Sequence, residues 1–99
     1  MVFIRRLAWD AWNLEHVLKH SVTPAEVEAA CHGRPSEHRQ SYKDRFFVIG
    51  ATKTGRIISV ILGQVPGAAP GVYCVFTAQP SDRKERRFYE QAQERPNER

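Results

Sequence analysis

The spacing of apolar side chains in the first third of the chain predicts a short helix. Leu14, Val17 and Leu18 stand at positions i, i+3 and i+4, which places them on one face of a helix. Asp10 can cap the start of this helix with its carboxylate, and Lys19 and His20 suit the C-terminal end of the helix dipole. We therefore expect a helix from Asp10 to His20 that buries its leucines and valine.

A second helix is predicted directly after the first one. Thr23 has the hydroxyl of an N-cap, Pro24 is favoured at the first helical position, and Glu26 can reach back to the Thr23 amide. Gly33 is typical of a helix end. The second helix is therefore expected to be short and to end near His32.

Beyond these helices the pattern changes from a helical to an extended period. The segments Arg45–Ile49, Arg56–Leu62 and Val72–Thr77 are rich in β-branched and aromatic residues, which favours strands. Turn-forming residues over Gly50–Gly55 predict a hairpin between the first two strands. The polar segment Glu37–Tyr42 is predicted to add an edge strand.

A charged helix closes the predicted fold. Asp82 and Glu85 have the spacing of a capping box, and helical spacing continues to about Gln93. We predict an α+β domain with two N-terminal helices, a three- to four-stranded antiparallel sheet and a C-terminal helix. This single domain is expected to span residues 1–92, and residues 93–99 are expected to form a charged tail.

Composition and charge narrow the classes of function. The chain has 99 residues, 41% of them hydrophobic, and 15 Lys plus Arg against 11 Asp plus Glu, which gives a net charge of +4. A chain this short forms one core and has no room for a large enclosed cofactor cavity. The basic balance favours an anionic partner, nucleic acid first, and a merely soluble basic surface is the alternative.

No apolar stretch approaches the ~20 residues that span a bilayer. The first residues also lack the apolar segment of a secretory signal, because Arg5 and Arg6 are soon followed by Asp10. We therefore expect a cytoplasmic protein that has no membrane partner.

The two cysteines are expected to be reduced thiols in the core. Cys31 and Cys74 form no CxxC motif. A zinc site built from Cys31 with His16, His20 or His32 is the alternative, but the paired ligand spacing of structural zinc is absent. The sequence therefore predicts no metal and no cofactor.

One set of residues, in a fixed order along the chain, resembles the BrnT toxins of bacterial type II toxin–antitoxin systems. The resemblance runs from Leu7 to Tyr89, and it rests on Trp9-Asp10, Asn13, Lys19-His20, Val22, Arg45, Ile49-Gly50, Gly55-Arg56, Thr77-Ala78, Glu85-Arg86 and Tyr89. It implies a RelE-like fold, a ribonuclease activity that arrests translation, and a cognate antitoxin with which the chain would form a hetero-oligomer.

The chain departs from that family at two places. Thr77-Ala78-Gln79 stands where the family usually has Ser-Ala-Arg, so a commonly basic position is neutral. The Pro/Gly segment Gln64–Gly71 is longer than the usual connection. These departures favour a second hypothesis, in which an inactive toxin-like domain binds an antitoxin or nucleic acid as a regulator.

RNA cleavage of this kind needs activation of the ribose 2′-hydroxyl, stabilisation of the pentavalent phosphate and protonation of the leaving oxygen. Arginine suits the second task because its planar fork stays charged and binds two phosphate oxygens. The residues expected to act in catalysis are Arg56, Arg86, Tyr89 and His20. The residues expected to bind RNA are Arg45, Arg83 and Lys19.

Each of these assignments has a structural alternative. Arg56 can instead be a rim charge paired with Asp44 or Glu37. His20 can simply satisfy the last carbonyls of its helix. Glu85, which also lies near Tyr89, is expected to act first as a helix cap.

Overall fold

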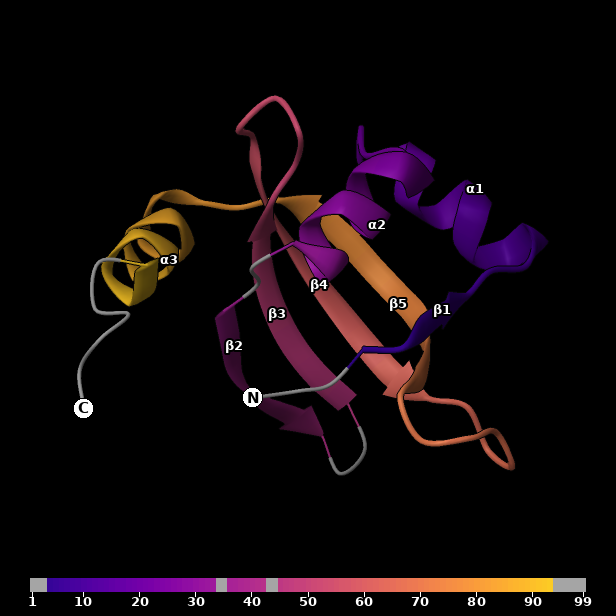
Figure 1. Cartoon of the computed structure of the whole chain (residues 1–99). Coiled ribbons are helices and arrows are strands. Elements are labelled where there is room, and N and C mark those ends of the chain that lie inside the picture. Colours follow the sequence, from indigo (N-terminus) through magenta and orange to yellow (C-terminus); the bar gives the residue numbers. More distant parts are fainter. Residues whose placement is uncertain (1–3, 34–35, 43–44, 94–99) are drawn as a thin grey trace.

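Five strands and three helices make up the part of the chain that the computed structural model describes, residues 4–33, 36–42 and 45–93 (Figure 1). In chain order they are β1 (Arg6–Ala8), α1 (Ala11–Lys19), α2 (Pro24–His32), β2 (Ser36–Tyr42), β3 (Arg45–Ala51), β4 (Ile57–Gln64), β5 (Val72–Pro80) and α3 (Arg83–Gln93). The strands form one sheet in the order β1-β5-β4-β3-β2.

The architecture is α+β, as predicted, but the sheet is mixed. Strands β2 to β5 pair antiparallel in sequence order, and β2 lies at the edge as expected. The prediction of a three- to four-stranded, purely antiparallel sheet is wrong, because a fifth strand, β1, precedes the helices and pairs parallel to β5, with Arg6 opposite Val72. Three residues carry no readable alternation, so β1 exists as a strand only through this long-range pairing.

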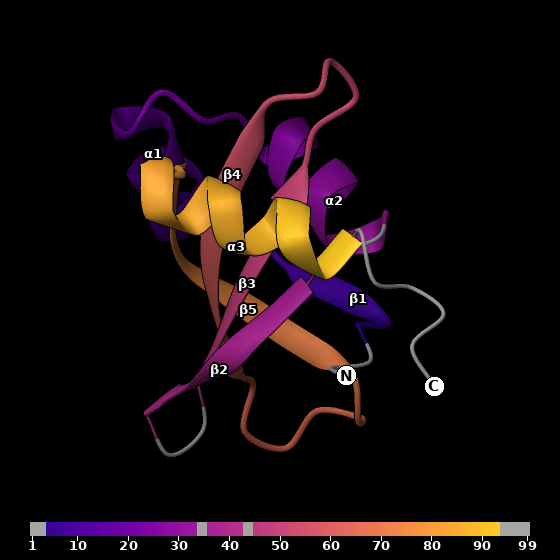
Figure 2. The same ribbon diagram turned by 90° about the vertical axis from the view of Figure 1, so that its left-hand side faces the viewer.

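The sheet has a first face covered by α1 and α2 and a second face on the side of α3 (Figures 1 and 2). Side chains alternate along β4, so Ile58, Val60 and Leu62 enter the core of the first face. Ser59 points to the second face, where it contacts Glu85 of α3. The first face therefore holds the main core, and α3 packs on the opposite side.

Helix α1 buries less than its sequence predicts. Val17 is fully buried, but Leu14 is 37% exposed and Leu18 is 55% exposed. The second buried side chain is Asn13, whose amide donates a 3.1 Å hydrogen bond to the Ala8 carbonyl. A polar anchor to the end of β1, rather than a wide apolar face, therefore sets how α1 lies on the sheet.

Helix α2 begins at the predicted capping box and packs unusually close to β3. The Glu26 amide donates to the Thr23 hydroxyl, and the Thr23 amide donates to the Glu26 carboxylate. At Gly50 of β3, an added Cβ would lie 2.4 Å from the carbonyl oxygen of Ala30 in α2. Only glycine fits between these two backbones.

The predicted hairpin between β3 and β4 is confirmed. The Thr52 amide donates to the Arg56 carbonyl at 2.8 Å, and the Gly55 amide donates to the Thr52 carbonyl at 3.0 Å. Gly55 has a φ of 90°, which a residue with a side chain rarely adopts. This turn places Arg56 immediately before the first residue of β4.

No helix within residues 4–33, 36–42 and 45–93 is long and apolar enough to cross a membrane. Helix α3 ends at Gln93, the first residue of the predicted tail. The remaining tail residues, 94–99, lie outside the described residues, so the tail stays a prediction.

Candidate functional site

Helix α3 carries the densest group of cations in the described chain. Its sequence contains four basic side chains against two carboxylates. All four basic side chains are exposed: Arg83, Lys84, Arg86 and Arg87. We call this group the α3 cations, and it presents positive charge on the second face of the sheet.

The start of α3 is fixed to the sheet by a polar network. Glu85 accepts hydrogen bonds from the Asp82 amide and the Ser59 hydroxyl, both at 3.0 Å, and the Glu85 amide donates to Asp82 at 2.8 Å. The hydroxyls of Ser59 and Ser81 lie 2.6 Å apart, and both side chains are buried. The predicted capping role of Glu85 is confirmed, and its carboxylate also joins the helix to β4.

Arg86 and Tyr89 lie three residues apart on α3 and therefore share one side of it. The Arg86 guanidinium donates a 2.7 Å hydrogen bond to the Ser81 carbonyl, at the junction of β5 and α3. A guanidinium has five N–H donors, so this bond leaves donors for a phosphate. The structure thus brings one predicted cation and one predicted proton-transfer group to the same helix side.

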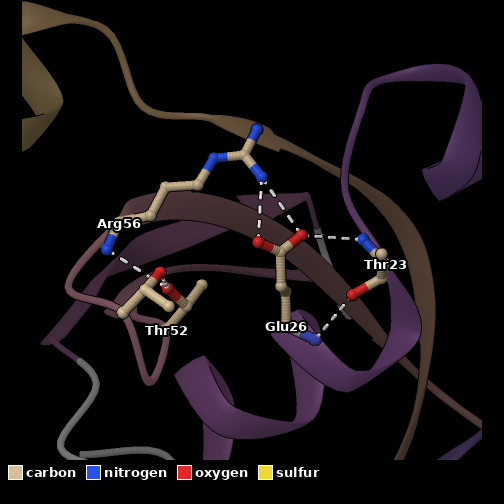
Figure 3. A network of polar contacts seen from close by, with 5 residues as sticks. Thr23, Glu26, Thr52 and Arg56 are labelled. Carbon is tan, nitrogen blue, oxygen red and sulfur yellow. Dashed lines mark hydrogen bonds and ion pairs between the residues drawn. The ribbon is translucent and has the colours of Figure 1, made fainter.

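The guanidinium of Arg56 is bound to a carboxylate within the protein (Figure 3). Its Nη1 atom lies 3.1 Å from Oε1 and 3.0 Å from Oε2 of Glu26 in α2. The Thr23 amide and Arg56 hold the pKa of Glu26 below its ordinary value, although partial desolvation opposes them. Glu26 is therefore ionised at neutral pH and offsets the charge of Arg56.

This ion pair differs from the rim pairing considered from the sequence. Asp44 lies outside the described residues, and the side chain of Glu37 is not described. The observed partner, Glu26, is 30 residues away along the chain. The sequence predicted only that Glu26 caps its own helix.

The structure does not bring Arg56 and Arg86 together on one face. Arg56 is tied to Glu26 of α2, on the first face, whereas Arg86 belongs to α3 on the second face (Figures 1 and 2). Both lie toward the same end of β4, because the Ser81 amide donates to the Ile57 carbonyl at 3.0 Å. The sheet nevertheless stands between the two helices that position them.

His20 and Lys19 end α1 and are exposed. The His20 amide donates to the Val17 carbonyl at 3.0 Å, so the residue occupies the C-cap of α1. Its ring meets the ring of His16 edge-on at 5.2 Å, and that ring stacks on Trp12 at 4.8 Å. These residues belong to a helix on the first face, and α3 with Tyr89 lies across the sheet from them.

Arg45 joins an aromatic ring on the second face. Its Cζ atom lies 3.8 Å from the centre of the Phe76 ring. Gly63 of β4 is opposite Arg45 in the sheet, and a Cβ there would lie 2.1 Å from the Phe76 ring. Sequence reasoning missed Phe76, although a glycine within an apolar strand is a recognised signal of close approach.

The described part of the chain contains no group of three or more His, Cys, Asp or Glu side chains placed to hold a metal ion. Both cysteines are free thiols, with Cys31 buried and Cys74 half-buried. Burial, with a smaller contribution from the charge of Glu28, raises the pKa of Cys31 to about 12. Cys31 is therefore a neutral core thiol at physiological pH.

No protein-family model matches the sequence, and no curated protein matches it.

Proposed function

We propose that this chain is an endoribonuclease toxin whose RNA site lies on the second face of the sheet, beside α3. The observation that carries the proposal is the group of exposed α3 cations, anchored through Ser59, Ser81 and Glu85 on the same side of the sheet as Arg45. Clustered arginines on one face provide the electrostatic footprint of an RNA-binding surface. The α+β class of the chain, with two helices before strands β2 to β5 and one helix after them, is compatible with the RelE-like fold that the resemblance implies.

The proposed reaction is a transesterification within the RNA. The 2′-oxygen attacks the adjacent phosphorus, the bond to the 5′-oxygen breaks, and a 2′,3′-cyclic phosphate and a 5′-hydroxyl result. Arg86 is proposed to stabilise the charge on the pentavalent phosphate, with Arg83 binding the neighbouring backbone. Tyr89, on the same side of α3, is proposed to pass a proton to or from the reacting oxygens.

The other predicted residues take different parts in this proposal. Arg56 is proposed to support the fold around α2, since Glu26 already neutralises it. His20 and Lys19 are proposed to act outside the reaction centre, because their helix covers the first face. The proposed reaction centre therefore contains fewer residues than the one predicted from the sequence.

Purified protein incubated with RNA in EDTA tests the activity. We expect cleavage that Arg86→Ala reduces by more than about tenfold, the scale for losing one charge-stabilising donor. Lys53→Ala is the matched control, because Lys53 is an exposed cation in the β3–β4 turn. RNA that stays intact at high protein excess, or equal cleavage by Arg86→Ala, contradicts the proposal.

A second function, RNA binding without cleavage, is favoured by the exposed neutral side chain of Gln79 near the end of β5. The resemblance implies a basic residue there. This second function is supported over the first if the protein binds RNA and leaves it uncleaved. Cells that express the folded protein should then also grow unchanged.

The proposed partner is a cognate antitoxin that covers the α3 cations with an acidic or amphipathic segment. The proposed place of action is the cytoplasm, where translated RNA is found. A purified complex should cleave RNA far more slowly than the free chain, and equal rates would contradict an antitoxin of this kind.

A further inference from the structure

Helix α1 carries the exposed large apolar side chains of the described residues. These side chains are Trp12, which is 58% exposed, Leu18, which is 55% exposed, and Leu14, which is 37% exposed. Single apolar residues are normal on a protein surface, but apolar residues that gather in one place mark interaction sites. We call this set, together with Glu15 and Lys19 on the same helix, the α1 patch.

Helix α1 is the outer helix of the layer that covers the first face. It packs on β5, whereas α2 packs on β3 and β4 (Figure 1). A helix has 3.6 residues per turn, so the buried Asn13 and Val17 mark the side toward the sheet, and Glu15 lies on the opposite side. Glu15 is exposed, so the α1 patch is open on the outside of this layer.

The two charged side chains of the α1 patch have no ionic partner within the described chain. Glu15 and Lys19 are both exposed, and neither forms a salt bridge or a side-chain hydrogen bond with a described residue. They stand about one helical turn apart. Each can therefore meet the opposite charge of a second α1 that runs in the reverse direction.

We propose that the α1 patch joins two copies of this chain through an antiparallel pair of α1 helices. A two-fold axis across the helices, level with His16, places Leu14 of one copy beside Leu18 of the other, and the reverse. The same axis brings Glu15 of each copy near Lys19 of the other. One symmetry operation therefore matches apolar with apolar side chains and acid with base, as a self-complementary interface requires.

Other arrangements fit the α1 patch less well. In a parallel pair of α1 helices, Glu15 would lie beside Glu15 and Lys19 beside Lys19, so like charges would repel. Nucleic acid is also a poorer occupant than a second copy, because Asp10 and Glu15 repel phosphate and the exposed leucines donate no hydrogen bond. The second face, with the α3 cations, stays open in the proposed dimer, since α1 lies across the sheet from α3.

Sedimentation equilibrium of the full chain, without RNA and at low salt, tests the dimer. Helix α1 has nine residues, so the interface is small. We expect a dissociation constant between about 1 μM and 1 mM. Leu18→Gln should raise it about tenfold or more, because a leucine side chain is lost from the interface in each copy.

Charge reversal tests the antiparallel register. Glu15→Lys brings ammonium groups together across the interface and Lys19→Glu brings carboxylates together, so each should weaken the dimer about fivefold or more. The double variant, Glu15→Lys with Lys19→Glu, restores opposite charges and should return the dissociation constant to within about twofold of the wild type. Glu90→Lys makes the same change at an exposed position of α3 and should leave the dimer unchanged. All of these side chains are exposed, so the variants are expected to fold, which circular dichroism verifies.

The outcomes decide the inference independently of the proposed function. A wild-type chain that stays monomeric up to about 1 mM overturns the proposal and leaves the α1 patch to a different partner. A dimer that either single reversal leaves intact also overturns it, as does a double variant that dimerises as weakly as the single ones. RNA cleavage takes no part in these measurements, so a chain without ribonuclease activity can still confirm the dimer.

Discussion

The Ser59 hydroxyl of β4 donates a 3.0 Å hydrogen bond to the Glu85 carboxylate of α3. A hydroxyl has one proton to donate, so the 2.6 Å contact between Ser59 and Ser81 is donated by Ser81. The direction of the chain is therefore Ser81 to Ser59 to Glu85. No residue of α3 is buried, so apolar burial holds this helix only weakly. The polar network therefore helps to fix the position of the α3 cations.

Removal of the Glu85 carboxylate is expected to destabilise the fold. Glu85→Ala removes the half of the capping box in which the Asp82 amide donates to Glu85, and it leaves the buried Ser59 hydroxyl without its carboxylate acceptor. Together these losses cost about 1–3 kcal/mol. The free energy of unfolding in urea measures the effect. Glu90→Ala is the matched control on the exposed side of α3, and its change should stay within about 0.5 kcal/mol. Similar losses in both variants would contradict the anchoring role.

The ion pair between Glu26 and Arg56 should contribute a pH-dependent part of the stability. Because the pKa of Glu26 is lowered in the folded state, the unfolded chain binds more protons near the ordinary value of 4.5. The contribution is therefore present above pH 4.5 and is lost as the pH falls through the lowered value.

Glu26→Gln isolates this contribution, since the amide oxygen can still cap α2. The wild-type protein should be more stable than the variant by about 1 kcal/mol at neutral pH, the upper range for a partly exposed pair. The difference should shrink as urea unfolding is repeated below pH 4.5. If the stability difference between the wild type and Glu26→Gln instead grows as the pH falls, the predicted direction of the pH dependence is wrong.

Gly50 is expected to tolerate no side chain. Gly50→Ala would place a Cβ 2.4 Å from the Ala30 carbonyl oxygen, and that contact is with backbone, which cannot rotate away. Separating α2 from β3 should cost about 3 kcal/mol. Thermal unfolding measures the loss, and Ala51→Ser at the next, half-buried position is the control. A variant as stable as the wild type would contradict the close approach.

The two thiols should differ in reactivity. Cys31 is buried and its pKa is raised to about 12, so it presents almost no thiolate at neutral pH. Cys74 is half-buried and should react with a disulfide reagent in the native protein. Cys74→Ser should abolish native labelling, while unfolding in denaturant restores the reaction of Cys31. Rapid native labelling of Cys74→Ser would contradict this assignment.

The sequence correctly predicted those helix ends and turns that depend only on residues close together in the chain. The capping boxes at Thr23 and Asp82 act over three residues, so they were readable in the sequence and are present in the structure. The turn ending at Gly55 and the strands on either side of it were predicted for the same reason. The apolar spacing around Val17 predicted a helix correctly but overstated how much of it is buried.

The candidate site depended on contacts that no local pattern contains. Arg56 has its partner 30 residues away, Ser59 has its acceptor 26 residues away, and β1 is a strand only beside β5. The sequence by itself determined the charges, the caps and the strand segments, because these follow from neighbouring residues. Only the tertiary structure decided which cations share a face, since the sheet register and the side on which each helix packs are set by burial across the whole chain.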